Sequence, residues 1–499
     1  MKKLRLMIDG QEIEIDAEGC PATVLEAAKL AGIHIPTLCH HPSLEPYGSC
    51  RLCTVQIVRD GRKRFVTACN YPVEEGLAVD TSSAEVADIR KMILELLLAR
   101  CPHERRIQEL AREYGIIKTR LPVEDRNCIL CGLCHRVCQE LVKVSATNAQ
   151  SRGIFRDVDT PYGELSEDCI GCGACALVCP THSISERKNI YPLTPADIKE
   201  LEGEFLKGMA DGDLGVNSEI FAGKSSIEGQ DGGMVTSILR HGIETGRLDA
   251  AVVAQKNERY GANAVSVDEA AGILQARGTK YVRVSVIAPL IDALQKGKKR
   301  IAVVGTPCQV RAVRKLQRQG YFNERFPGAE INIIGLFCFE SFDYSSLKNH
   351  IEALLGIDLD SADKVQIAKG KFIVLAGGKE YSCRVRELGN DVRAGCGFCD
   401  DLTGRLADIS IGSIGSPDGY STVIVRSDRG KRLLDEVLFC QREINRDEIV
   451  KLAGLKKKNA EKNFSVILKC PLSRLSSSNS SSRHQAINNG GKDYIVYHA

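Results

Sequence analysis

Two runs of four cysteines between residues 128 and 179 constrain the fold of this chain more than any other feature. The first run contains Cys128, Cys131, Cys134 and Cys138, and the second contains Cys169, Cys172, Cys175 and Cys179. Both have the spacing C-x2-C-x2-C-x3-C, and Pro180 follows the second run. A turn this tight lets three thiolates close on one face of a metal–sulfur core, so the fourth ligand must come from elsewhere in the chain. The runs therefore predict two four-cysteine metal sites.

The spacing resembles that of bacterial ferredoxins with two [4Fe–4S] clusters, in which the fourth cysteine of each run ligates the other cluster. This resemblance implies one cluster on Cys128, Cys131, Cys134 and Cys179, and another on Cys169, Cys172, Cys175 and Cys138. Zinc knuckles and disulfides are the alternatives, but zinc sites usually combine two C-x2-C pairs and not runs of four. The insert at 141–168 contains Arg152-Gly153-Ile154-Phe155 and is expected to add a hairpin, as a surface elaboration or a subunit contact.

Composition narrows the class of protein. The chain has 499 residues, enough for about three to four domains. A net charge of +3, no Trp and 5% aromatic residues argue against a nucleic-acid partner. Twenty-one cysteines without an export signal point to metal ligation and not to disulfides. Because no apolar run approaches the length of a membrane span, we expect a cytoplasmic protein without direct membrane insertion.

Residues 1–82 predict a different kind of cluster domain. Apolar residues alternate in Leu4–Ile8 and again in Glu12–Ile15, around an Asp-Gly turn, which predicts a β-hairpin followed by a short helix from Thr23 to Ala31. Four cysteines with the spacing C-x10-C-x2-C-x15-C come next: Cys39, Cys50, Cys53 and Cys69. This spacing suits a [2Fe–2S] cluster, with a longer first gap than the plant type, and a zinc site is the alternative.

The order of hairpin, helix and cysteine loop resembles the N-terminal β-grasp domain of the large complex I cluster subunit and of iron-only hydrogenases. The resemblance implies a [2Fe–2S] domain at 1–82. His34, His40 and His41 are expected to be exposed loop residues and not ligands, because four cysteines are already present. A helical connector is expected at 83–122, with Ser82 and Glu85 as a capping box. An α+β ferredoxin domain at 123–190 and a linker at 191–214 follow.

Residues 215–430 have a different character, because glycine becomes frequent and apolar strand-like runs alternate with helices. This alternation predicts an α/β domain. A glycine-rich turn at 229–233 precedes the expected helix Met234–Glu244, and such turns offer N–H groups to phosphates. Alone this signal is weak, because the spacing is not G-x-G-x-x-G. Strands are expected at 250–254, 281–286, 301–304, 331–334, 409–411 and 422–425.

Seven motifs in this region occur in a recognisable order. They are Lys224-Ser225-Ser226, Gly229–Gly233, Gly278–Tyr281, Gly305–Gln309, Gly335–Glu340, Gly395–Asp401 and Ala407–Gly412. Together they resemble the coenzyme F420 hydrogenase/dehydrogenase beta subunit family, which includes the beta subunits of F420-reducing hydrogenase and F420-dependent formate dehydrogenase.

The family resemblance implies a C-terminal α/β flavin domain with FAD and one further [4Fe–4S] cluster. The matching ligands are Cys308, Cys338, Cys396 and Cys399. Of these only Cys396-x2-Cys399 is a local signal, and by itself it would indicate half a zinc site. The implied FAD contacts are Lys224, Ser225, Gly229, Gln230, Asp231, Gly232, Gly233, Thr306 and Gln309. The alternative role for Lys224 is that of an ordinary solvated lysine on the surface, because lysine is rarely buried.

The end of the chain, 431–499, carries no cofactor motif. A closing helix and a flexible tail are expected there, since the serine-rich tract 476–482 is typical of disorder. The lysine-rich segment 451–462 is expected to be a solvated helix face.

The expected cofactors are one [2Fe–2S] cluster, three [4Fe–4S] clusters and FAD, with coenzyme F420 as the hydride-carrying substrate. A flavin accepts a two-electron hydride and releases single electrons, which clusters carry one at a time. The sequence therefore predicts an oxidoreductase subunit that exchanges a hydride between F420 and FAD and passes single electrons to or from a partner. The alternatives are NAD(P)H, ferredoxin or another acceptor in place of F420, or a non-catalytic electron-relay subunit. The expected partner in a hetero-oligomer is ferredoxin or a hydrogenase, formate dehydrogenase, heterodisulfide reductase or NADH-dehydrogenase-like subunit.

Overall fold

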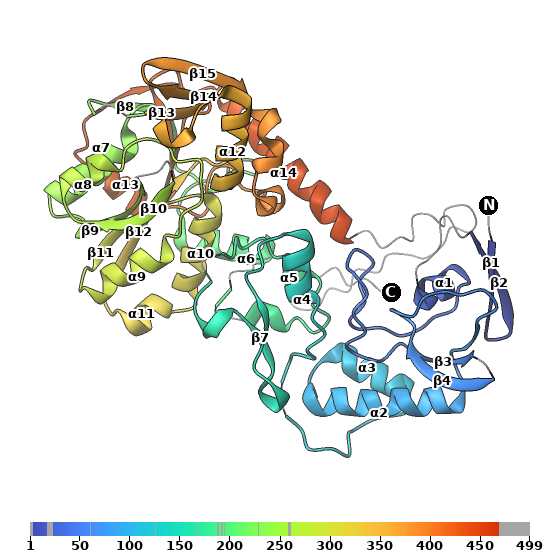
Figure 1. Cartoon of the computed structure of the whole chain (residues 1–499). Helices are drawn as coiled ribbons and strands as arrows, with labels where there is room; N and C mark the ends of the chain where they lie inside the picture. Colours follow the sequence, from blue (N-terminus) through green and yellow to red (C-terminus); the bar gives the residue numbers. More distant parts are fainter. Residues whose placement is uncertain are drawn as a thin grey trace.

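The computed structural model describes residues 3–16, 23–59, 61–124, 126–166, 168–186, 189–190, 193, 195–227, 229–257 and 261–468. Cys20, Cys470 and the serine-rich tract lie outside these ranges. The chain forms a smaller N-terminal lobe and a larger C-terminal lobe, and the two cysteine runs lie between them (Figure 1).

The N-terminal lobe is built on a five-stranded sheet with the order β2-β1-β5-β3-β4. The expected hairpin is confirmed as β1 paired with β2, and its turn places Asp9 and Gly10 in the left-handed region. Helix α1 begins after Thr23, which forms a capping box with Glu26. The elements are β1 Lys3–Ile8, β2 Gln11–Asp16, α1 Val24–Leu30, β3 Thr54–Arg59, β4 Arg62–Thr67 and β5 Ala78–Asp80.

Two helices connect this lobe to the cysteine runs, α2 Ala84–Arg100 and α3 Arg105–Glu113. The cap of α2 differs by one residue from the expected Ser82, because the hydroxyl of Ser83 accepts the N–H of Val86 at 3.3 Å. The apolar face of α2 packs with α3 against the cysteine loop of the N-terminal lobe. At the end of α2, Arg100 Nε donates to the carbonyl of Cys128 at 2.7 Å, which ties the helix to the first cysteine run.

The cysteine runs form short helical turns with a hairpin between them. The hairpin expected in the insert is confirmed as the antiparallel pair β6 and β7. The elements are α4 Leu133–Arg136, a wide helical turn Val137–Leu141, β6 Asn148–Gln150, β7 Asp157–Asp159, α5 Ala174–Leu177 and α6 Pro195–Phe205. Three single-turn 3-10 helices cover Gly153–Phe155, Pro161–Gly163 and Ser183–Glu186.

The C-terminal lobe is organised around an eight-stranded sheet with the order β10-β9-β11-β12-β16-β17-β8-β18. Strand residues alternate between two buried faces: Ile301 and Val303 pack with α9 and α10, whereas Ala302 packs with α7 and α8. Helices cover both faces of this mixed sheet, whose central strands β9, β11, β12 and β16 are parallel, which confirms the α/β class for this lobe. The strands are β8 Glu219–Ser225, β9 Ala250–Lys256, β10 Ala262–Val267, β11 Arg300–Gly305, β12 Glu330–Leu336, β16 Ile409–Gly412, β17 Ser421–Val425 and β18 Phe439–Arg442. The helices are α7 Met234–Glu244, α8 Ala270–Gln275, α9 Ile287–Gln295, α10 Pro307–Arg318, α11 Tyr321–Arg325 and α13 Asp428–Leu434.

One expected strand was wrong. Within 281–286 only Val282 makes an isolated bridge, to Phe342, and α9 begins at Ile287. The segment instead crosses the edge of the sheet and carries Tyr281, whose hydroxyl accepts the N–H of Ile367 at 2.9 Å.

A small subdomain interrupts the large lobe after β12. It packs α12 Tyr344–Leu355 on the sheet of β13 Lys364–Ala368, β14 Lys371–Ala376 and β15 Lys379–Arg384, around Phe342, Phe372 and Leu388. Two further single-turn helices at Val385–Asp391 and Ala394–Phe398 lead to the last cysteine pair.

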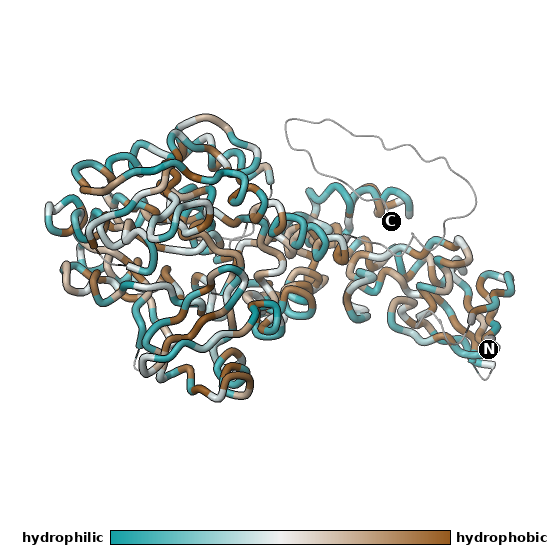
Figure 2. The backbone as a smooth tube through the Cα atoms, turned by 90° about the horizontal axis from the view of Figure 1, so that it is seen from above, coloured by the Kyte–Doolittle hydropathy of each residue, from teal (hydrophilic) through white to brown (hydrophobic). Residues whose placement is uncertain are grey.

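The final helix, α14 Arg446–Leu468, extends from the large lobe toward the N-terminal lobe (Figure 1). Seen from above, the two lobes are joined by a narrower region that contains strongly hydrophobic stretches (Figure 2). Within the described ranges, no helix has both the length and the apolar character that a membrane crossing requires.

Candidate redox sites

The N-terminal cysteine loop brings four thiols together at the edge of the sheet. Cys39, Cys53 and Cys69 are each 1% exposed. The thiols of Cys50 and Cys69 donate toward Cys39, which lowers the pKa of Cys39 and raises the pKa of both donors. The backbone N–H of Cys50 also donates to Cys39 Sγ at 3.3 Å. Thiols and N–H groups that converge in this way fit a metal–sulfur cluster.

Histidines of the same loop are less exposed than expected. The ring of His40 has no hydrogen-bond partner at either nitrogen among the described groups, and burial lowers its pKa to about 4. Burial also lowers the pKa of His41. His40 is therefore neutral at physiological pH, and the four cysteines remain the predicted ligands.

The two central cysteine runs share one local geometry. In each run a glycine in the left-handed region follows the second cysteine, Gly132 with φ 82° and Gly173 with φ 81°. Each glycine starts a short helix, α4 or α5, which carries the third cysteine. Residues with a side chain rarely adopt this φ. Glycine therefore permits the tight turn that the C-x2-C-x2-C spacing needs.

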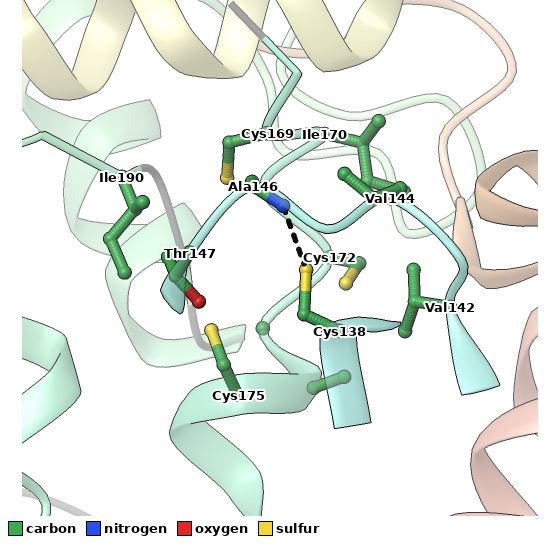
Figure 3. A pocket seen from close by; sticks show the side chains of 12 residues that line it. Cys138, Val142, Val144, Ala146, Thr147, Cys169, Ile170, Cys172, Cys175 and Ile190 are labelled. Atoms are coloured by element: carbon green, nitrogen blue, oxygen red, sulfur yellow. Dashed lines mark hydrogen bonds between the residues drawn. The ribbon is translucent and has the colours of Figure 1, made fainter. Parts of the chain in front are cut away.

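The second set of thiols lines a small pocket (Figure 3). Its lining includes Cys138 from the first run and Cys169, Cys172 and Cys175 from the second, which is the exchanged set predicted from the spacing. The N–H of Ala146 donates to Cys138 Sγ at 3.4 Å. Burial raises the pKa of Cys172 to about 12, so its thiolate form at neutral pH requires the positive charge of a metal.

One buried hydroxyl points into this cavity. Thr147 is 5% exposed, and its Oγ1 has no partner among the described groups. Figure 3 shows this oxygen directed into the same space as the sulfur atoms. A buried polar atom of this kind needs an acceptor, and a sulfur-rich cluster in the cavity would provide one.

The other exchanged set is also brought together. Cys131 is electrostatically coupled to Cys134, Cys179 and Cys128, and burial raises its pKa well above the usual value. Burial likewise raises the pKa of Cys134 to about 12. The side chain of Cys179 lies 3.6 Å from Ser183 Oγ.

The C-terminal set assembles from three segments at one edge of the large sheet. Strands β8, β9, β11, β12 and β16 run in the same direction, so their carboxyl ends meet at this edge. Cys308 lies in the first turn of α10, directly after β11, and Cys338 follows β12. The single-turn helix after the small subdomain adds Cys396 and ends at Cys399. All four thiols interact electrostatically, and burial raises the pKa of Cys396 to about 11.

Within the described residues, no three His, Cys, Asp or Glu side chains close tightly enough to hold a single metal ion. The observations that fit clusters at the central and C-terminal sets are the converging thiols and the unpartnered hydroxyl of Thr147.

The predicted FAD contacts lie at the same carboxyl edge as Cys308 and Cys338. The glycine-rich turn is packed so closely that a Cβ on Gly232 would lie 2.2 Å from the carbonyl oxygen of Gly223, and one on Gly233 2.1 Å from that of Ile227. Gln230 joins this turn to the 278–281 motif, since its Oε1 accepts the N–H of Thr279 at 2.7 Å. Asp231 lies in the same turn, and burial raises its pKa.

Other predicted FAD contacts have local partners. Lys224 is exposed, with Nζ 5.7 Å from the centre of the Tyr420 ring, whereas Ser225 is buried. Thr306 caps α10 in a capping box with Gln309. Gln309 Nε2 also donates to the carbonyl of Val284 at 2.5 Å, so its amide is already engaged within the fold.

The cysteine sites are in contact in series. Ser49 Oγ, beside Cys50, donates to the carbonyl of Leu130 in the first run at 3.2 Å. At the other end, Gly395 packs on Val144 and Ile170, which line the pocket of Cys138, Cys169, Cys172 and Cys175, and a Cβ there would lie 2.9 Å from both side chains. Another small pocket is lined by Cys169 and Gln309.

Two buried cations beside the C-terminal set were not predicted. Arg311 is 4% exposed and donates to Asp400 at 2.5 Å, and Lys456 on α14 is 3% exposed. Arg311 follows Cys308 by three residues, so the two side chains lie on one face of α10. This spacing could have been recognised in the sequence. Lys456 lies in the segment expected to be solvated, and that expectation was wrong for this residue.

Comparisons with known proteins divide the chain into four matching regions. Residues 1–84 match a 2Fe-2S iron-sulfur cluster binding domain, and residues 111–183 match a 4Fe-4S dicluster domain. Residues 220–292 and 298–445 match the N-terminal and C-terminal parts of the coenzyme F420 hydrogenase/dehydrogenase beta subunit.

Individual relatives agree. A subunit of the F(420)H(2) dehydrogenase of Methanosarcina mazei is 31% identical over 356 residues, which are 68% of this chain and 92% of that protein. The coenzyme F420-dependent sulfite reductase of Methanocaldococcus jannaschii is 32% identical over 354 residues, and this chain spans about half of its length.

A solved structure is also similar. It is a chain of the F420-reducing [NiFe] hydrogenase complex of Methanosarcina barkeri, with 31% identity, a TM-score of 0.50, and coverage of 52% of this chain and 94% of that one. The alignment covers nearly the whole length of the dehydrogenase and hydrogenase relatives. This agrees with the resemblance carried by the motifs from Lys224 to Gly412. The chain therefore belongs to the coenzyme F420 hydrogenase/dehydrogenase beta subunit family, with 2Fe-2S and 4Fe-4S dicluster domains preceding the family region.

Proposed function

We propose that this chain exchanges a hydride between coenzyme F420 and FAD and passes single electrons through its iron–sulfur clusters to or from a partner redox subunit. The observation that carries the proposal is the contact in series of the four cysteine sets, which begins beside the predicted flavin contacts. The Gly395–Ile170 packing and the Ser49–Leu130 hydrogen bond are the two outer junctions of this series, and the two central sets adjoin each other through α4 and α5.

The residues assigned to each cofactor follow from this proposal. The [2Fe–2S] cluster is held by Cys39, Cys50, Cys53 and Cys69, in a domain that we propose to be a β-grasp fold. The three [4Fe–4S] clusters are held by the two exchanged sets and by Cys308, Cys338, Cys396 and Cys399. When bound, FAD supplies the conversion between a hydride and single electrons.

The chain's own residues would bind and orient the flavin. The N–H groups of the 229–233 turn and the start of α7 offer donors to phosphate oxygens. Gly232 and Gly233 pack this turn closely on the carbonyl oxygens of Gly223 and Ile227, which fixes its position at the edge of the sheet. Lys224 at the end of β8 adds a positive charge at the same edge. We propose this region, 215–430, as the flavin domain.

Partner subunits are proposed from the same family relationship. The similar relatives are named as subunits or chains of an F420H2 dehydrogenase and of a hydrogenase complex. We therefore propose that the chain acts in a hetero-oligomer, with a partner that accepts or delivers electrons at the N-terminal lobe.

Reduction of the anaerobically purified protein by different hydride donors tests the proposal. Reduced F420, NADH and NADPH are added in parallel, while flavin absorbance and the EPR signals of reduced clusters are followed. We expect reduced F420 to bleach the flavin and to produce cluster signals. A response to a nicotinamide alone would favour the alternative donor, and clusters without flavin or hydride response would leave an electron-relay subunit.

A pair of cysteine variants sharpens this experiment. In Cys399→Ala, which breaks the C-terminal set, reduced F420 should still bleach the flavin, but the central clusters should remain oxidised. Cys440→Ala is the matched control, because Cys440 is exposed on β18 and belongs to none of the sets. Rapid reduction of the central clusters in Cys399→Ala would contradict the proposed order of sites.

A further inference from the structure

Helix α14 delivers a buried cation to the C-terminal cysteine set. Lys456 is 3% exposed, and its Nζ donates to the carbonyl oxygen of Cys338. The next residues, Lys457 and Lys458, are exposed on the same helix. The burial of Lys456 is therefore specific to one position of a lysine-rich segment.

A buried ammonium is costly unless negative charge faces it. Among the described residues, no carboxylate lies within 4.0 Å of Lys456 Nζ. Asp401 is nearby, but its carboxylate accepts the backbone N–H groups of residues 403–405. Asp401 and Glu340 interact with Lys456 only electrostatically, without a direct ion pair. With a cluster bound, the thiolates of the C-terminal set would add negative charge beside Lys456.

The geometry at Lys456 supports this assignment, because α14 holds the buried Nζ on the carbonyl oxygen of Cys338. The other buried cation, Arg311, differs because Asp400 pairs with it directly at 2.5 Å. Lys456 thus brings to the set a positive charge that has no direct carboxylate partner among the described residues.

We propose that Lys456 is the fixed counter-charge of the C-terminal iron–sulfur site and raises the reduction potential of the cluster held there. This inference rests on the proposed function, which assigns that cluster to Cys308, Cys338, Cys396 and Cys399. A positive charge buried beside the cluster stabilises the reduced form, which carries one more negative charge than the oxidised form. The three other clusters lie on other segments and should be affected less.

The test is an EPR-monitored redox titration of the holoprotein with Lys456→Met, which keeps the length of the side chain and removes its charge. The signal of the C-terminal cluster is identified as the one missing from Cys399→Ala. We expect its equilibrium constant for one-electron reduction to fall at least tenfold in Lys456→Met, which is about 59 mV. Lys457→Met is the matched control and should leave this potential unchanged.

A charge-retaining variant separates the charge from the packing. Lys456→Arg should keep both the cluster and a potential close to that of the natural protein. If Lys456→Met loses iron but Lys456→Arg retains it, the result still supports a role for the charge. If both variants lose iron, the proposed role of the charge is overturned. An unchanged potential in Lys456→Met with full iron would overturn the inference while the proposed function stands. Absence of the fourth cluster from the natural protein would instead overturn both.

Discussion

At the scale of single residues, the second central site contains a hydroxyl that only a bound group would satisfy. Thr147 Oγ1 is buried without a partner among the described groups and lines the cavity with four cysteines. Hydrogen bonds to the sulfur atoms of a cluster favour its reduced form. We expect Thr147→Val, which has nearly the same shape, to lower the reduction potential of this cluster.

The expected shift for Thr147→Val is about 20–60 mV, which corresponds to about 0.5–1.5 kcal/mol for one electron. A redox titration followed by EPR measures it. Thr147→Ser, which keeps the hydroxyl, is the control and should stay near the natural potential. A shift of equal size in both variants would show that packing, and not the hydroxyl, sets the potential.

Asp408 shows that a family motif residue can have a structural role. Its carboxylate is 0% exposed and pairs with Arg314, also 0% exposed, at 2.9 Å. It also accepts the N–H of Ile333 and the hydroxyl of Ser427. These bonds join α10, β12 and the start of α13, so the residue supports the sheet edge on which the site is built.

At the scale of elements, α14 joins the C-terminal site to the N-terminal lobe. Phe464 packs on Phe398, between the cysteines Cys396 and Cys399, with ring centroids 5.3 Å apart and planes at 82°. Just beyond it on α14, the carbonyl of Val466 accepts Ser43 Oγ at 2.5 Å, in the N-terminal lobe. The helix therefore contacts both ends of the series of sites.

We expect Phe464→Ala to loosen this connection, because it removes the aromatic contact that holds the end of α14. The free energy of unfolding should fall by about 1–3 kcal/mol, and amide exchange in the last two turns should become faster. Urea denaturation and hydrogen exchange measure the two effects. Val466→Ala, which trims an exposed side chain of the same turn, should change neither. Equal protection of α14 in both variants would contradict the role given to the helix.

Elements with local sequence signals were predicted. The hairpin around Asp9-Gly10 and helix α7 depend on patterns within short segments, and the structure confirms both. The exchanged cysteine sets came from the resemblance to bacterial ferredoxins and stay a prediction. The segment 281–286 was misread as a strand because its apolar residues pack in two different cores, Tyr281 in the small subdomain and Val286 with α9 and α10. Strands β8 and β10 were not predicted, because their apolar stretches are shorter or more polar than those of the strands that were.

Long-range contacts were beyond the sequence patterns. The C-terminal thiols come from three segments, and the family resemblance suggested their grouping before the sheet topology explained it. Lys456 could not be distinguished from Lys457 or Lys458, because only the packing of α14 on the Cys338 segment buries one of the three. The Gly395 contact with Ile170 depends in the same way on the docking of two domains.

At the scale of the whole molecule, the arrangement is a series of four cysteine sets that spans both lobes. The flavin candidates lie at the carboxyl edge of the large sheet, and the [2Fe–2S] candidate lies in the small lobe (Figure 1). Hydride chemistry would thus occur in the large lobe, beside the C-terminal cysteine set, and single electrons would pass through the two central sites to or from the small lobe.

The measurement that tests this account most directly is the metal and sulfide content of the anaerobically purified protein. One two-iron cluster and three four-iron clusters predict about 14 iron atoms and about 14 acid-labile sulfides per chain, without stoichiometric zinc. About 10 iron atoms would mean that one four-cysteine set holds no four-iron cluster. Zinc in place of iron, or sulfide far below iron, would contradict the series of clusters on which the proposed function depends.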